Sequence, residues 1–434
     1  MTLIFKNITF IIAFKIRDVI IKVNFLLKIK EKDMESYVAR QQVREVNRKL
    51  FANDLIYSNE DRVTLELLIS NIIQRYDSED SIAGVPTILE IKPSNIDKDT
   101  LDKILLLSTD SVIIEINNSV LAVPEKVNII RKIKDRGYKL SVVVNKTDDV
   151  FTLAKILADI VKFDIQNIPP AMSEARNAFT CKKLAYNVNT PEDFVIAEAA
   201  NIDYYEGTYI SPSTEVEIDN SEHSNVNFIE IIAMINSDSD VHKIARVISR
   251  DSLISAQVIR LANSVYYGTR YRIDSVEDAV VRIGLNNLKR WIFLLQFSKN
   301  DNVPEELLQT AYQRAIFCER ITKESKIKEL TANDAYLIGL FSTLDVLTGK
   351  PMDMVLAGMN LNETVEDALI YRDGDGGDLL NLIRAYEEAN WKRVDKYISN
   401  FKINKDKMFK IYFDSLDEVT QLWKSLTELG GIVK

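Results

Sequence analysis

The chain has 434 residues, which is long enough for two or three compact domains, each with its own core. Apolar residues make up 46% of it and charged residues 27%, as is usual for globular proteins. The formal net charge of −9 argues against broad binding to nucleic acid or to anionic membranes, so no nucleic-acid partner is expected.

Residues 1–33 are apolar and basic, but charged residues interrupt them every few positions. The longest uncharged run, Asn7–Phe14, has eight residues, whereas roughly 20 are needed to cross a bilayer, so no transmembrane segment is expected. No small-residue cleavage site follows, so a signal peptide is not expected either. Two interpretations stay open: an amphipathic leader that contacts a membrane surface, or an extension upstream of a native start at Met34. We favour the extension, because a recognisable domain opens directly after Met34.

Strand and helix patterns alternate from about residue 34 to 213. The predicted strands are Ser111–Ile116, Lys139–Val144, Ile160–Ile165 and Lys183–Val188. Their starts lie 28, 21 and 23 residues apart, which leaves room for one crossover helix between each pair. Nearly continuous apolar strands joined in this way indicate a parallel sheet that is buried on both faces. An α/β barrel and an open sheet both fit this pattern.

Residues 214–227 are polar and lack apolar periodicity, which predicts a linker. Beyond them the apolar residues recur with the period of a helix. A helix is predicted from near Asp251, and Ser275 with Asp278 forms a capping box for the next. Further helices are predicted at about 304–324, 331–348, 363–372 and 377–396. The segment 228–434 is therefore expected to be all-helical.

Three stretches of the helical half resemble the signatures of HDOD domains. They are Ile248–Gly268 (ISRDSLISAQVIRLANSVYYG), Ile273–Trp291 (IDSVEDAVVRIGLNNLKRW) and Gly339–Leu347 (GLFSTLDVL). The third resembles a signature seen where HDOD follows an EAL domain. HDOD domains are similar in fold to HD phosphohydrolases but lack the metal ligands. This chain agrees, because Ser224 follows His223 and Lys243 follows His242, which leaves no His-Asp pair; both histidines are expected on the surface.

The first half resembles EAL domains at both ends. Tyr37–Leu55 (YVARQQVREVNRKLFANDL) is similar to their opening, and Asp203–Pro212 (DYYEGTYISP) to their end. EAL domains are TIM-type barrels, so the resemblance selects the barrel over the open sheet. The implied fold class is α/β plus all-α: a reduced, degenerate EAL barrel over 34–213, followed by a helical HDOD bundle with C-terminal helices.

EAL phosphodiesterases hydrolyse cyclic di-GMP with two metal ions held by carboxylates and an Asn, together with a Lys and a glutamate base. The resemblance matches nine positions to that site: Asp54, Glu90, Glu115, Val143, Val144, Lys162, Tyr186, Asn189 and Glu206. Glu115 and Lys162 keep the family residue. Val143 and Val144 stand where the paired aspartates are expected, and Tyr186 stands where the base is expected.

These replacements predict a chain without catalytic residues, metal or cofactor. Valine offers no oxygen to a metal ion, and the unperturbed pKa of tyrosine, about 10, is too high for a base near neutral pH. Lys162 and Glu115 could instead form an internal ion pair. Cys181 and Cys318 lack metal-type spacing, and we expect them to be reduced thiols in the cytoplasm.

The resemblance implies a cytoplasmic bacterial signalling protein that acts through protein partners and is linked to cyclic di-GMP. Two alternatives stay open: a receptor that binds cyclic di-GMP without turnover, and a weak residual phosphodiesterase. A homodimer is also compatible with the sequence.

Two further segments have competing interpretations. Arg372–Asp378 (RDGDGGD) looks like a calcium loop, but Arg384 stands where an EF-hand needs a glutamate, so a connection between helices is expected. The cluster Tyr266, Tyr267, Arg270, Tyr271 and Arg272 fits a helix-to-helix loop better than a partner-binding patch.

Overall fold

The computed structural model divides the chain into two compact units. The first comprises Met1–Ile210 with Glu387–Trp391 and Lys405–Phe409, and the second comprises the rest. The structure describes residues 37–47, 49–58, 62–77, 85–144, 154, 156–167, 181–207, 222–237, 239–264, 267, 271–297, 303 and 305–428. The predictions for residues 1–33 lie outside these ranges, as do residues 145–153, 155 and 168–180 between the predicted strands.

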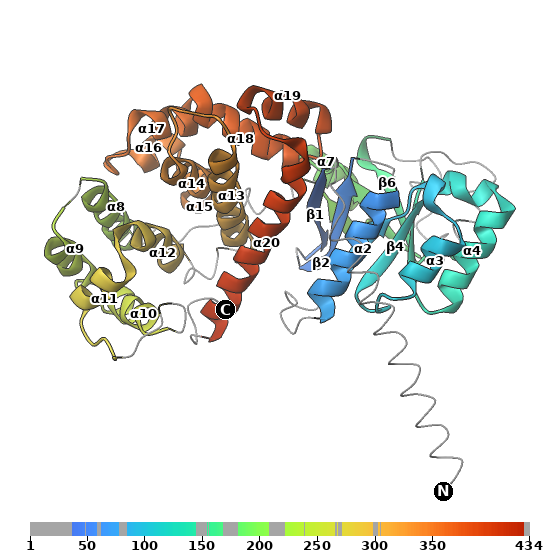
Figure 1. Cartoon of the computed structure of the whole chain (residues 1–434), viewed down its shortest axis with the longest axis horizontal. Helices are drawn as coiled ribbons and strands as arrows, with labels where there is room; N and C mark the ends of the chain where they lie inside the picture. The colour runs from blue at the N-terminus through green and yellow to red at the C-terminus, as the bar shows by residue number, and fades with distance from the viewer. Residues whose placement is uncertain are drawn as a thin grey trace, which may run out of the picture. The chain divides into compact units, whose positions relative to one another are not determined.

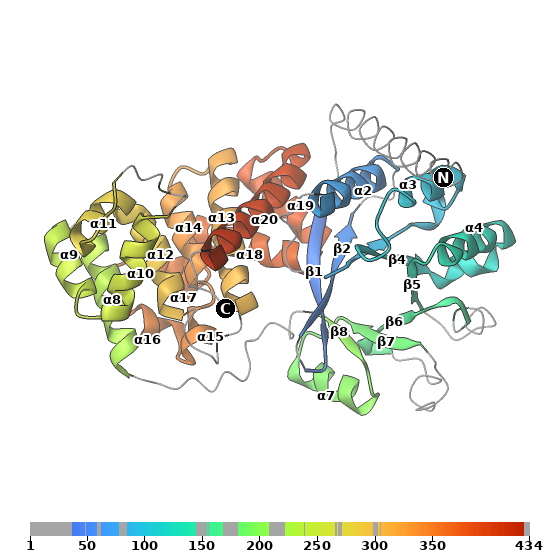
Figure 2. The same cartoon turned by 90° about the horizontal axis from the view of Figure 1, so that it is seen from below.

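Eight strands of the first unit close into a barrel in chain order (Figures 1 and 2). They are β1 (Val38–Glu45), β2 (Leu50–Tyr57), β3 (Thr87–Glu90), β4 (Val112–Asn117), β5 (Lys139–Val143), β6 (Ile160–Asp164), β7 (Lys182–Tyr186) and β8 (Tyr204–Glu206). The four strands predicted by residue range are all present, each end within two residues of the prediction.

The barrel departs from an all-parallel TIM barrel at its first strand. β1 runs antiparallel to both β2 and β8, while β2 through β8 are mutually parallel. The cause is local. The connection 46–49 between β1 and β2 is too short for a crossover helix, so the two strands pair as a hairpin.

The described helices of this unit follow their strands. They are α2 (Arg62–Asp77), α3 (Lys98–Ile104), α4 (Pro124–Asp135) and α7 (Pro191–Ala199). Figure 1 shows α2, α3 and α4 outside the strands. Three of these helices begin at a signal in the sequence. The Asp97 side chain caps α3 by accepting a hydrogen bond from the Thr100 backbone N–H, proline is the first residue of α4, and Thr190 and Asp193 form a capping box for α7. Three short 3₁₀ turns, η1 (Pro93–Asn95), η2 (Asn118–Ala122) and η3 (Ile165–Asn167), lie in the connections.

One layer of the barrel interior is apolar. Its buried members, one from each of six strands, are Val43, Ala52, Ile88, Ile113, Ile160 and Leu184. Alternation along each strand therefore turns the side chain two residues further on to the same interior. This rule positions the site described below.

The second unit is helical. Its helices are α8 (Glu222–Asn236), α9 (Val241–Ile248), α10 (Ser252–Ala262), α11 (Val276–Ile283), α12 (Leu285–Phe297), α13 (Glu305–Glu324), α14 (Ala332–Phe341), α15 (Leu344–Thr348), α16 (Met352–Leu356), α17 (Glu363–Ile370), α18 (Gly374–Glu387), α19 (Trp391–Phe401) and α20 (Lys405–Glu428). The short segments of α19 and α20 that cluster with the first unit are given above. Helix α14 is buried on every side from Ala335 to Phe341, at the centre of this unit.

Three boundaries in the helical half were predicted wrongly. Helix α8 begins at Glu222, inside the range 214–227 expected to be a linker, because a helix anchored by buried residues such as Phe228 and Ile231 propagates into polar residues at little cost. The range 331–348 holds two helices, separated by Ser342 and Thr343. The range 377–396 is also broken, since Ala389 adopts a left-handed φ of 52° between α18 and α19.

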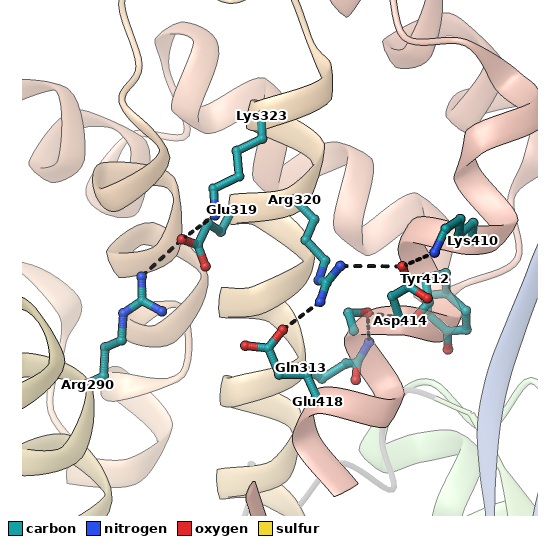
Figure 3. Close-up of polar contacts among 10 residues, drawn as sticks. Arg290, Gln313, Glu319, Arg320, Lys323, Lys410, Tyr412, Asp414 and Glu418 are labelled. Atoms are coloured by element: carbon teal, nitrogen blue, oxygen red, sulfur yellow. Dashed lines mark hydrogen bonds and ion pairs between the residues drawn. The ribbon is translucent and has the colours of Figure 1, made fainter. Parts of the chain in front are cut away.

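Helices α13 and α20 are joined by polar contacts (Figure 3) and by aromatic packing. Arg320 of α13 pairs with Asp414 and Glu418 of α20 at 3.5 and 2.7 Å. Beneath these pairs, Phe317 of α13 packs edge-on against Tyr412 of α20. The fold class expected from the sequence is confirmed: a closed eight-stranded barrel is followed by a helical region.

Candidate functional site

A polar layer lies directly above the apolar layer of the barrel, toward the carboxyl ends of the strands. On five strands the residue two positions after an apolar-layer residue is one that the sequence assigned to the candidate site. The pairs are Ala52 and Asp54, Ile88 and Glu90, Ile113 and Glu115, Ile160 and Lys162, and Leu184 and Tyr186. Period-two alternation explains this placement, and TIM-type barrels carry their chemistry at this end.

Lys162 is the centre of the layer. Its ammonium forms ion pairs with Asp54 from β2, with Glu206 from β8 at 2.8 Å and with Glu115 from β4 at 3.3 Å. All four side chains are at most 7% exposed. The expected pair between Lys162 and Glu115 is therefore present, and two further carboxylates join it. We call these four residues the Lys162 cluster.

Burial and charge shift the protonation of the cluster in opposite ways. Burial raises the pKa of Glu206 to about 8 and that of Glu115 to about 7, against the lowering effect of Lys162. Burial alone would lower the pKa of Lys162, but Asp54, Glu115 and Glu206 together raise it well above its usual value. The lysine is thus held in its charged form, while the raised pKa values of Glu115 and Glu206 favour protonation of these two carboxylates.

Ser141 of β5 is a cluster neighbour that the sequence did not identify. Its hydroxyl donates to Glu115 Oε2 at 2.8 Å, and its side chain is fully buried. The available signal was its position two residues before Val143, which the strand alternation turns toward the same interior.

The two valines occupy different positions. Val143 pairs in register with Lys162, so it belongs to the polar layer without contributing a polar atom. Val144 follows the end of β5, is buried, and donates its backbone N–H to the Lys162 carbonyl oxygen at 2.8 Å. Tyr186 ends β7, and the centre of its ring lies 5.6 Å from the Lys162 ammonium. Burial raises the pKa of Tyr186 further above its usual value.

Glu90 and Asn189 also lie outside the Lys162 cluster. Glu90 ends β3 and pairs with Lys92 at 2.6 Å, although its charge still acts on Glu115. Asn189 is exposed in the connection before α7, where its backbone N–H donates to Asp193. In the part of the chain that the structure describes, no three His, Cys, Asp or Glu side chains form a group that could hold a metal ion.

The remaining candidates have ordinary surroundings. His242 lies in the first turn of α9, two-thirds exposed, and pairs with Glu277. His223 lies in α8, but its side chain is outside the described residues. Tyr267 accepts a hydrogen bond from the Trp291 indole at 2.9 Å, whereas Tyr266 and Arg270 are not described. Both cysteines are free thiols.

Comparison with known proteins identifies one domain family and two relatives that span most of the chain. Residues 225–357 match the HDOD domain model. The chain is 22% identical to the uncharacterized protein YuxH of Bacillus subtilis, over 88% of this chain and 98% of the relative. It is 23% identical to a Vibrio cholerae protein named cyclic di-GMP phosphodiesterase CdgJ, over 83% of this chain and 87% of the relative.

Among solved structures, the chain is similar to EAL proteins. The Klebsiella pneumoniae BlrP1 complex with calcium and cyclic di-GMP matches 40% of this chain and 54% of its own, with a TM-score of 0.34 and 15% identity. The EAL domain of Mycobacterium smegmatis DcpA matches 41% of this chain and 92% of its own, with a TM-score of 0.34 and 14% identity. A search of the described helices finds none with the length and apolar character needed to cross a membrane.

Proposed function

We propose that this protein is a non-catalytic component of bacterial cyclic-di-GMP-linked signalling, in which the barrel is a scaffold and the chain acts by binding protein partners. The link to cyclic di-GMP rests on the identity to CdgJ along most of both chains. The observation that carries the non-catalytic assignment is Val143, which lies beside the buried Lys162 in the polar layer, where the resemblance expects an aspartate ligand, and which has no oxygen to offer.

The charge balance of the cluster supports this proposal. A pair of divalent ions needs several carboxylates to offset the repulsion between the two cations. Here the ammonium of Lys162 already pairs with Asp54, Glu115 and Glu206, and Val143, beside it in the same layer, has no oxygen to offer. The residues present do not fit two divalent cations, and we derive no metal-dependent step.

The residue at the expected position of the general base also supports the non-catalytic proposal. Tyr186 stands where the resemblance expects a glutamate, and burial moves its pKa upward, away from the range in which a general base works near neutral pH. A phenol that stays protonated can orient a ligand but cannot abstract a proton from water at pH 7.

The direct test is a hydrolysis assay with the full-length protein and cyclic di-GMP, in Mg²⁺ and in Mn²⁺, with separation of the products by chromatography. We expect no turnover above that of buffer, while purified CdgJ under the same conditions serves as the positive control. Turnover that requires metal would contradict the proposal.

A matched variant separates the protein's own activity from a contaminant. Glu115 is buried in the Lys162 cluster, so Glu115→Gln should abolish any genuine phosphodiesterase activity of the barrel. Glu192 is exposed in α7, outside the cluster, and Glu192→Gln is the control. Activity that survives Glu115→Gln unchanged comes from another protein and leaves the proposal standing.

A second candidate is a receptor that binds cyclic di-GMP without turnover. It is favoured by the lysine that the barrel retains at position 162 and by the relative named as a cyclic di-GMP phosphodiesterase. Titration calorimetry with cyclic di-GMP, with and without Mg²⁺, distinguishes the two. Saturable binding that weakens on Glu115→Gln would support the receptor proposal and contradict the scaffold proposal. The absence of any heat of binding would support the scaffold proposal.

A further inference from the structure

Positive charge gathers where α4 ends and β5 begins. The segment Arg131–Lys139 (RKIKDRGYK) contains five basic residues and one acidic residue, a formal charge of +4 in a chain whose net charge is −9. Because α4 ends at Asp135 and β5 begins at Lys139, the segment lies at the amino ends of the barrel strands. The Lys162 cluster lies toward the carboxyl ends, so the barrel chemistry does not involve this segment.

Four of the five basic side chains are exposed. Helix α4 buries Val127, Ile130 and Ile133 on its inner side, and its outer side faces away from the strands (Figure 1). Residues four positions apart on a helix are neighbours, so Lys132 and Arg136 lie side by side at the end of α4. The exposed basic residues of the segment are Arg131, Lys132, Arg136 and Lys139. We call these four residues the basic patch.

The basic patch has no ion-pair partner among the described residues. The fifth basic residue, Lys134, is different, because it pairs with Asp159. The exposed acids at this end of the barrel are Asp102 near the end of α3, Asp110 before β4, and Asp135, and none of them lies within ion-pair distance of the patch. Four exposed cations therefore remain available to a charged ligand.

Stabilisation of the helix end accounts for only part of the basic patch. A cation in the last turn of a helix interacts favourably with the negative end of the helix dipole, which explains Lys132. Lys139 belongs to β5 instead. Like charges four positions apart, such as Lys132 and Arg136, repel each other, and an acidic ligand bound beside both of them relieves that repulsion.

We propose that the basic patch is a docking surface for an acidic segment of a partner protein. Charge complementarity carries the choice, since cations without partners are matched by closely spaced carboxylates. Among the large apolar side chains that the described residues expose, none belongs to α4 or β5, so the patch offers nothing to insert into a membrane and no aromatic ring on which a nucleobase could stack. The inference rests on the proposed function, in which the chain acts by binding protein partners.

The test measures fluorescence anisotropy with the full-length protein and a labelled, capped peptide of alternating glutamate and serine. We expect this acidic peptide to bind and a peptide of alternating lysine and serine not to bind. The affinity should fall as NaCl is raised from about 0.05 to about 0.3 M, because salt screens exposed charges. A DNA duplex and phosphatidylglycerol vesicles serve as competing probes, and stronger binding to either of them would overturn the choice of an acidic protein segment.

The decisive variant combines Lys132→Gln with Arg136→Gln. It should bind the acidic peptide about fivefold more weakly, because each exposed cation contributes modestly to the affinity. Lys243→Gln combined with Arg246→Gln is the matched control and should bind as the parent protein does. Both of its residues are exposed in α9 and form no ion pair with another described residue, so the two double variants change the net charge equally.

Cross-linking locates the bound peptide. Carbodiimide couples carboxylates to lysine amines, so it should join the acidic peptide to Lys132 or Lys139, as mass spectrometry of the digested protein can show. Preferential coupling to Lys243, no binding of the acidic peptide, or equal losses of affinity in the two double variants would each overturn the inference. Metal-dependent turnover of cyclic di-GMP would instead contradict the proposed function and leave these binding results unaffected.

Discussion

The barrel and the helical unit use ion pairs in different surroundings. In the barrel, one ammonium is surrounded by three carboxylates, and all four side chains are nearly inaccessible to water. In the helical unit, Arg320 of α13 pairs with Asp414 and Glu418 of α20, and Lys410 of α20 also pairs with Asp414 (Figure 3). Each of these side chains is about one-third exposed or more. The barrel group has more carboxylates than cations and is buried, whereas the helical group has equal numbers of acidic and basic side chains and is exposed to solvent.

This difference indicates which contacts stabilise each unit. Removing one partner of a buried charge group leaves an uncompensated charge and costs about 3–5 kcal/mol, while exposed pairs contribute roughly 0.2–1 kcal/mol. Helices α13 and α20 are therefore held mainly by aromatic packing, in which Phe317 contacts Tyr412 and Tyr312 contacts Trp423. In the barrel, the Lys162 cluster itself is a determinant of stability.

The largest effect is expected for Lys162→Met. The substitution keeps the apolar stem but removes the ammonium that pairs with the buried carboxylates, so the free energy of unfolding at pH 8 should fall by about 3–5 kcal/mol. Urea denaturation of the full-length protein measures it. Lys182→Met is the control, because Lys182 is 61% exposed and pairs at the surface with Asp203. Equal losses in the two variants would contradict the distinction between buried and exposed ion pairs.

A somewhat smaller loss is expected for Phe317→Ala in the helical unit. Phe317 is 2% exposed and packs edge-on against both Tyr386 and Tyr412, so its truncation leaves a cavity that costs about 3 kcal/mol. The same denaturation experiment measures it, with Phe317→Leu expected to lose less because it fills most of the volume. A negligible loss would show that aromatic packing does not hold α13 and α20 together.

The sequence predicts the polar layer better than it predicts the cluster within it. The step from Ile113 to Glu115 follows from strand alternation, which is local and therefore readable from the chain. The pairing of Lys162 with Asp54 depends instead on closure of the barrel, which brings β6 and β2 to face each other across its interior. Closure is a long-range property, and no local pattern encodes it.

The helical half shows the same limit. The caps at Asp251 and Ser275 are local, and both lie where the sequence places them. The break between α18 and α19 has no comparable signal, because Ala389 is a good helix former that nevertheless adopts a left-handed φ. Tertiary packing decides that position.

The buried ion pairs of the barrel should also make its free energy of unfolding depend on pH, in contrast to the exposed pairs of the helical unit. The pKa of Glu206 rises from 4.5 to about 8 on burial, so the folded protein binds more protons than the unfolded chain between these values. The contribution of Glu206 to the free energy of unfolding is fully present below pH 4.5 and is lost as the pH rises toward 8. Relative to the parent, Glu206→Gln should gain on the order of 2 kcal/mol from pH 5 to pH 8 in urea denaturation. A difference that does not vary with pH would contradict this account.

The smallest effect is expected for Arg320→Gln. Arg320 pairs with Glu418 at 2.7 Å, but its side chain is 33% exposed, so water replaces much of what the substitution removes. The expected loss in the free energy of unfolding is about 0.5 kcal/mol, and it should shrink further in 1 M NaCl because salt screens exposed charges. Arg250→Gln, which removes another exposed pair, with Glu230 and away from α20, should also lose little. A loss several times larger, insensitive to salt and absent in Arg250→Gln, would mean that the pairs of Figure 3 hold α20 in place and that the aromatic contacts are secondary.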